Sequence, residues 1–106
     1  MTHEITLIIP TTGKWWEAAK AVQFFMLNTW GGYSQYEGTG GWRDTDGAAV
    51  YEPHLRFVCT TRDEQEHNII LDVRKLVADL HAILPDEECF YANVRPAGRT
   101  FFIPKG

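Results

Sequence analysis

Three ionisable side chains alternate along one short segment, and their types and spacing are the first sign of chemistry in the chain. Glu52, His54 and Arg56 stand two positions apart within residues 48–61, "AAVYEPHLRFVCTT". In a β-strand such residues project from one face of the sheet, while the alternate positions project from the other. The second, mostly apolar set is Tyr51, Leu55, Phe57 and Cys59. The polar row is therefore either a solvated sheet face or a set of ligand-contacting groups beneath a subunit interface.

A segment rich in glycine and aromatic residues lies directly before this strand. Residues 31–47, "GGYSQYEGTGGWRDTDG", contain six glycines, although glycine weakens strands and helices alike. The stretch "GTGG" resembles part of a phosphate-binding loop. However, it leads into a strand and not into a helix N-terminus, whose dipole such loops need. A deformed strand that shapes a binding site is the favoured interpretation.

The two segments flank a polar turn, "DTDG", and predict a β-hairpin with a loop of about four residues. Symmetric pairing about this turn places Thr39 opposite Glu52 and Glu37 opposite His54. We expect a bulge at Gly40–Gly41 that changes the direction of Trp42. Pro53 indicates a second bulge or a strand edge beside Glu52.

The expected groups suit a ligand with a positive centre and polar ends. Trp42 offers an aromatic face, on which a cation binds well, unless it fills the core instead. Glu52 provides a counter-charge, and the glycines leave open backbone. Tyr36 is either a wall of the site or an interface residue.

The order of elements predicts the fold that positions these groups. We expect strands at 4–10, 32–43, 48–61 and 89–95, a short last strand at 99–104, and helices at 14–29 and from Thr61, with Glu64 in a capping box, to Leu84. Right-handed crossovers then place both helices on one face of a mostly antiparallel sheet. This is a ferredoxin-like α+β fold of β-α-β-β-α-β order, related to PII-type trimers, in one domain over residues 1–106. The apolar residues of 14–29 exceed one narrow stripe, so we expect a neighbouring subunit to cover exposed surface.

Composition narrows the classes of function. The net charge of −4 and the absence of a basic run argue against nucleic acid as a partner. Two cysteines are too few for a disulfide scaffold, and the apolar run at the N-terminus is too short to cross a membrane. The four histidines show no metal-ligand spacing. We therefore expect a cytoplasmic protein without a metal or a cofactor.

The run "GGYSQYEGTGGWRDTDGAAVYEPHLRF", followed by a helix and a last strand, resembles small phage enzymes that cleave S-adenosylmethionine. These lyases, long called hydrolases, share a glycine-flanked strand that ends in a Gly-x-aromatic-Arg-acid step, then a hairpin and a glutamate early in the next strand. The matching positions are Gly40 or Gly41, Trp42, Arg43, Asp44 and Glu52. The aromatic residue of this step is a tyrosine in those enzymes.

The resemblance implies a PII-like homotrimer with sites between subunits and Glu52 as the catalytic residue. The substrate-binding residues would be Gly40, Gly41, Trp42, Tyr36, His54 and Arg56. The implied reaction is intramolecular: it yields 5′-methylthioadenosine and homoserine lactone, and it would counter restriction of phage DNA. The alternative is a non-catalytic PII-like oligomer that binds a small nucleotide-like molecule or a host protein.

Overall fold

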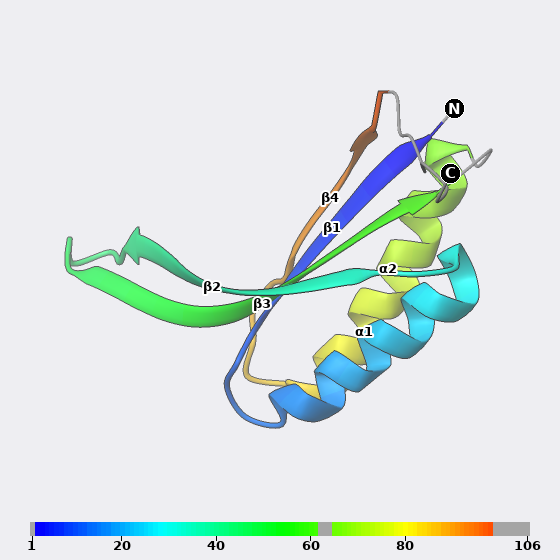
Figure 1. Cartoon of the computed structure of the whole chain (residues 1–106). Coiled ribbons are helices and arrows are strands. Elements are labelled where there is room, and N and C mark those ends of the chain that lie inside the picture. The colour runs from blue at the N-terminus through cyan, green and yellow to red at the C-terminus, as the bar shows by residue number, and fades with distance from the viewer. Residues whose placement is uncertain (1, 62–64, 99–106) are drawn as a thin grey trace, which may run out of the picture.

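The computed structural model describes residues 2–61 and 65–98 of the chain. Its elements are strand β1 (His3–Pro10), helix α1 (Trp15–Trp30), strands β2 (Ser34–Arg43) and β3 (Ala49–Thr61), helix α2 (Glu66–Ile83) and strand β4 (Tyr91–Pro96) (Figure 1). This order confirms the predicted β-α-β-β-α-β sequence of elements.

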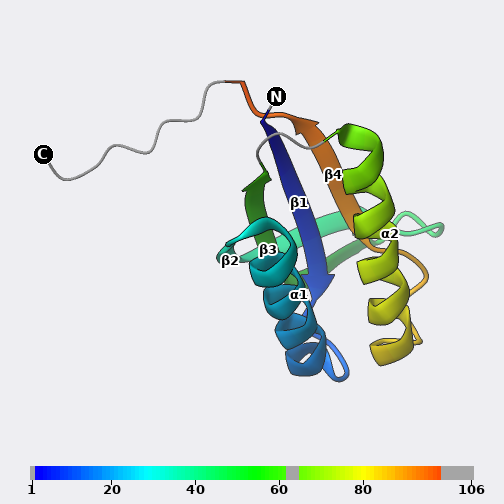
Figure 2. The same cartoon turned by 90° about the vertical axis from the view of Figure 1, so that its right-hand side faces the viewer.

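The strands form one sheet in the order β2-β3-β1-β4, and each neighbouring pair is antiparallel. Both helices lie side by side on one face of this sheet (Figure 2). The predicted ferredoxin-like α+β fold is therefore confirmed, with the opposite face of the sheet left uncovered within the described part of the chain. We call that uncovered side the open face.

The core lies between the sheet and the two helices, as the alternation along the strands requires. Odd-numbered residues of β1 and β3 point toward the helices, and even-numbered residues point to the open face. The buried apolar side chains are Ile5, Leu7, Ile9, Ala18, Ala19, Val22, Met26, Leu55, Phe57, Cys59, Ile69, Val73, Leu76, Leu80 and Leu84. The predicted separation of β3 into an apolar and a polar set is confirmed for the part of the strand that the helices cover, where Leu55, Phe57 and Cys59 are buried.

The β2–β3 hairpin continues beyond this core as a projecting arm (Figure 1). Strand β1 pairs with β3 only as far as Pro10, opposite His54, so beyond that point β3 pairs with β2 alone. We call residues 39–53 the arm. The Thr11 amide donates to the Pro53 carbonyl at 3.2 Å, which shows that the main-chain groups of Pro53 face the side where β1 ends. Proline is tolerated there because the ladder between β1 and β3 ends at this point, and the predicted strand edge is confirmed.

The start of the second helix and the ends of the chain differ from the prediction. Thr61 is the last residue of β3, paired with His3, so it is not a helix cap. Helix α2 follows Gln65, whose side chain makes no capping bond. The predicted capping box is therefore wrong, since Thr61 is committed to the sheet. Glu64 and the strand predicted at 99–104 lie outside the described residues, and β4 begins at Tyr91 rather than at 89.

The connection from α1 to β2 offers a paired test of backbone conformation. Gly31 caps α1 with φ of 91°, and its amide donates to the carbonyls of Met26 and Leu27. A side chain in this left-handed region is strained, so Gly31→Ala should lower the free energy of unfolding by about 1 kcal/mol. Gly32 has no such φ and nothing within 4 Å of an added Cβ, so Gly32→Ala should be near neutral in urea denaturation. Equal losses would contradict this conformational argument.

Candidate functional site

The register of the hairpin decides which of the predicted site residues meet. Glu52 lies opposite Gly40, and His54 lies opposite Gly38. The predicted pairs of Thr39 with Glu52 and of Glu37 with His54 are therefore wrong by one residue. The pairing of β2 with β3 is also continuous from Ser34 to Arg43, so the predicted bulge at Gly40–Gly41 is absent from the described hairpin.

The one-residue shift originates at the tip of the arm. The Asp44 carboxylate accepts hydrogen bonds from the amides of Asp46 and Ala48, both at 2.9 Å, and the Asp44 amide donates to the Ala48 carbonyl at 2.9 Å. The Arg43 guanidinium donates to the Gly47 carbonyl at 2.8 Å. The Asp44–Ala48 hydrogen bond adds one more pair to the ladder and closes a loop of residues 45–47, in which Gly47 has a φ of 81°, in place of the predicted loop of residues 44–47. Arg43 and Asp44 are thus held by the turn and not directed toward a ligand.

This register gathers most of the predicted site residues on the open face. Tyr36 pairs with Arg56, Gly40 with Glu52, and Trp42 with Val50, all with even numbers and all on that face. This row runs from the arm, which holds Trp42 and Glu52, into the part of the sheet that also pairs with β1. We call Tyr36, Trp42, Glu52, His54 and Arg56 the arm row. Gly41 lies on the other face, opposite Tyr51, and Glu37, opposite Leu55, does so too.

The glycines of β2 accommodate rings from β3. A Cβ added at Gly38 would lie 2.8 Å from His54 Nε2, and one at Gly40 would lie 3.6 Å from His54 Nδ1. On the opposite face, a Cβ at Gly41 would lie 3.3 Å from the ring of Tyr51. The imidazole of His54 thus lies over the backbone of two glycines. These positions were expected to leave backbone open to a ligand, and a cross-strand ring covers part of it instead.

The arm row presents an acid without an internal partner. Within residues 2–61 and 65–98, the half-buried Glu52 carboxylate makes neither an ion pair nor a hydrogen bond. The cation of the same row, Arg56, lies four residues further along β3 and over the ring of Tyr36, 4.8 Å from its centroid. Trp42 is 49% exposed and stands two residues from the position opposite Glu52. The row therefore offers a negative charge and an aromatic surface to a molecule from outside the chain.

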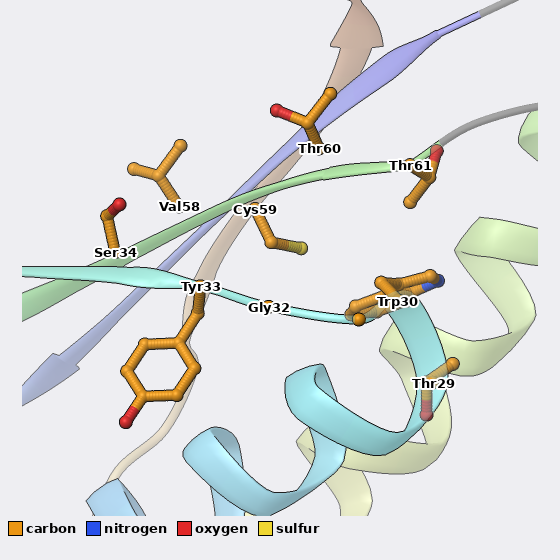
Figure 3. A pocket seen from close by; sticks show the side chains of 10 residues that line it. Thr29, Trp30, Gly32, Tyr33, Ser34, Val58, Cys59, Thr60 and Thr61 are labelled. Atoms are coloured by element: carbon orange, nitrogen blue, oxygen red, sulfur yellow. The ribbon is translucent and has the colours of Figure 1, made fainter. Parts of the chain in front are cut away.

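A second feature, a hollow of about 560 Å³, lies at the far end of the same two strands (Figure 3). It is lined by residues 29–34, which connect α1 to β2, and by residues 58–61 of β3. None of these side chains is charged, and Trp30 and Tyr33 provide aromatic walls. This hollow was not predicted from the sequence. The feature of the sequence that could have indicated it is the pair Gly31–Gly32, which follows the end of α1 and precedes the start of β2 at Ser34.

Buried polar atoms without partners gather at this end of the molecule. Among the described residues they are His3 Nδ1, Trp30 Nε1 and Thr61 Oγ1, and Thr61 is only 2% exposed. Such atoms usually cost about 1–3 kcal/mol each and call for an explanation, such as an ordered water or a bound molecule. Trp30 and Thr61 both line the hollow.

A buried cysteine, Cys59, also lines the hollow. Burial raises the pKa of the Cys59 thiol to about 12, whereas Cys89 is exposed. Since the thiolate is the reactive form, iodoacetamide at about pH 8 should modify Cys89 and spare Cys59. Mass spectrometry of the native protein checks this result, with the urea-unfolded chain as the control in which both react. Equal rates in the native protein would show that this end of β3 opens readily.

The described residues contain neither a candidate metal site nor a helix that could span a membrane. No group of three or more His, Cys, Asp or Glu side chains that could hold a metal ion occurs in residues 2–61 and 65–98. Neither helix in this part of the chain is long and apolar enough to cross a membrane.

Comparison with known proteins places the fold among solved structures. No family model matches the chain, and no curated protein matches it in sequence. The chain is similar to two divalent cation tolerance proteins: CutA from Archaeoglobus fulgidus, with a TM-score of 0.61 and 12% identity, and Cut A1 from Thermus thermophilus, with a TM-score of 0.65 and 15% identity. Each of these alignments covers 95% of this chain and 88% of the other.

A phage SAM lyase in complex with S-methyl-5′-thioadenosine is similar to a comparable degree. Its TM-score is 0.67 at 10% identity, over 92% of this chain and 82% of that chain. At these identities the likeness extends to the fold alone. The fold is thus shared by proteins with different names.

Proposed function

We propose that the protein degrades S-adenosylmethionine, acting as a lyase at the arm row. The observation that carries this proposal is the Glu52 carboxylate. It is half-buried on the open face, lies beside Trp42, and has no partner among the described residues. A sulfonium substrate with an α-ammonium group carries the positive charge that such an acid and aromatic surface favour. The fold shared with a phage SAM lyase supports this choice of substrate.

The proposed reaction needs no nucleophile from the protein. The carboxylate of the substrate attacks its own γ-carbon and forms the C–O bond of homoserine lactone. The C–S bond breaks, and its electron pair stays on sulfur, which leaves as neutral 5′-methylthioadenosine. The protein must fold the methionine moiety into attack geometry and stabilise its charges. Glu52 would hold the ammonium or sulfonium side, with Trp42, Tyr36 and the main chain near Gly40 and Gly41 as walls.

The site is proposed to be completed between subunits of a homotrimer. The arm extends beyond the core of its own chain (Figure 1) and exposes Trp42 and Tyr51, the latter by 75%. Helix α1 likewise exposes Phe24 by 71% and Leu27 by 53%. Apolar side chains exposed to this extent are typical of interaction surfaces. A neighbouring subunit that covers the arm row would exclude water from the reacting groups and place His54 and Arg56 beside the substrate.

Incubation of the purified protein with S-adenosylmethionine tests the proposal. Chromatography should show 5′-methylthioadenosine and homoserine lactone in equal amounts. No product at high protein concentration would overturn the lyase activity. Binding of the substrate without turnover would favour the alternative, a non-catalytic PII-like oligomer that binds a small nucleotide-like ligand. Sedimentation should show a trimer, and a strict monomer would contradict the site between subunits.

A further inference from the structure

The hollow at residues 29–34 and 58–61 opens a gap in the hydrogen-bonded edge of the sheet. The Thr11 amide bonds to the Pro53 carbonyl, so odd-numbered residues of β3 direct their main-chain groups toward β1. The Asp44 amide bonds to the Ala48 carbonyl, so the even-numbered residues direct theirs toward β2. Thr60 therefore turns its N–H and C=O toward β2. However, the pairing of β2 begins only with Ser34, opposite Val58.

Within residues 2–61 and 65–98, Thr60 consequently offers one donor and one acceptor without a strand partner to the hollow. The residue that would continue the ladder opposite Thr60 is Gly32, which lies outside the strand. Gly32 and Thr60 both line the hollow, and nothing lies within 4 Å of a Cβ added at Gly32. Figure 3 shows the side chains of Ser34, Val58 and Thr60 on the same face of the two strands.

The unpartnered buried atoms on the walls indicate that this end lacks hydrogen-bond partners of its own. The Nε1 atom of Trp30 and the Oγ1 atom of Thr61 have none in the described part of the chain. Figure 3 shows the Trp30 ring beside the β2 lead-in, below Thr61. A ligand or a water cluster that reaches these groups would supply what the fold does not.

The chemistry of the walls selects the class of ligand. The lining carries no charged side chain, so a phosphate, a carboxylate or an ammonium would lose hydration without gaining a counter-charge. The volume of about 560 Å³ is in the range of small-molecule sites. An added peptide strand would need a run of free main-chain groups, whereas Thr60 provides one donor–acceptor pair. A flat, uncharged heterocycle fits the aromatic walls and this single pair.

We propose that this hollow binds an uncharged aminoheterocycle of the adenine type, held by the main chain of Thr60 beside the Trp30 ring. A ring nitrogen accepts from the Thr60 N–H, and the neighbouring exocyclic amino group donates to the Thr60 C=O. Glu52 lies six residues from Val58 on β3, which is roughly 20 Å at the usual rise of a strand. The hollow is thus distinct from the arm row of the same chain, and the inference does not depend on the proposed lyase activity.

Calorimetric titration of the full chain with adenine, and in parallel with purine, tests the inference. Purine keeps the ring nitrogen and lacks the amino group, so it should bind about tenfold more weakly than adenine. The variant Gly32→Leu places a side chain in the open space without a strained φ and should abolish the binding of both. Ala48→Leu, at the exposed tip of the arm, is the matched control and should bind adenine like the parent protein.

The binding results apply once thermal melting shows that the Gly32→Leu and Ala48→Leu proteins are folded. Absence of adenine binding at millimolar concentration overturns the inference and leaves ordered water as the occupant of the hollow. Binding that survives Gly32→Leu places the ligand elsewhere and overturns it too. If Gly32→Leu does not fold, chemical shift changes of the Trp30 and Thr60 amides on adding adenine to the parent protein replace it. Unchanged shifts at both positions would then overturn the inference.

Discussion

Glu52→Gln is expected to lower kcat/KM for cleavage of S-adenosylmethionine by at least about 100-fold, or roughly 2.7 kcal/mol of transition-state stabilisation. The amide is nearly isosteric with the acid but carries no charge, so it cannot balance the positive charge of the substrate. The fold should be unaffected, because Glu52 makes no ion pair or hydrogen bond within the described residues. Release of 5′-methylthioadenosine, followed by chromatography at several substrate concentrations, measures the change.

Glu37→Gln is the matched control for this experiment. Glu37 is also an acid of the hairpin, so its replacement by glutamine removes the same charge. However, Glu37 lies opposite Leu55, on the other face of the sheet. The value of kcat/KM for the Glu37→Gln protein should stay within about twofold of the parent value, since surface charges at a distance are screened. Equal losses in both variants would indicate a general effect of net charge. A fully active Glu52→Gln protein would remove Glu52 from the mechanism.

Phe57→Ala is expected to lower the free energy of unfolding by about 3–5 kcal/mol. The side chain is fully buried between the sheet and the helices, and its ring lies 6.1 Å from that of Tyr33. Its removal forfeits apolar burial and leaves a cavity beneath the helices. Because domains of this size are stable by about 5–15 kcal/mol in all, this loss is a large share of the total stability. Urea denaturation should show a lower midpoint with an unchanged slope.

Tyr51→Ala on the same strand provides the comparison. Tyr51 has the same parity as Phe57, but it lies on the arm and is 75% exposed. Its replacement should cost less than about 1 kcal/mol, mostly through its contact with Gly41. A loss as large as that of Phe57→Ala would show that the arm is buried, and a dependence of that loss on protein concentration would identify a subunit interface.

The site could be predicted from the sequence in its residue types but not in its pairing. Alternation along residues 48–61 correctly separated Glu52, His54 and Arg56 from the core-facing positions. The partners on β2 were displaced by one residue, because the hydrogen bonds of Asp44 set the width of the turn. A one-residue shift exchanges the faces of a strand, so it moved Gly38, Gly40 and Trp42 onto the side of Glu52 and removed Glu37 and Thr39 from it.

The sequence by itself determined the order of the elements, the fold class and the polar and apolar faces of β3. These follow from local periodicity, from turn residues and from the handedness of crossovers, which operate over short stretches of chain. Only the tertiary structure decided the register of the arm, the packing of His54 over Gly38 and the gap in the sheet beside Thr60. Each of these depends on where one strand ends relative to its neighbour. That relation is set by contacts between residues far apart in the chain, which no local pattern encodes.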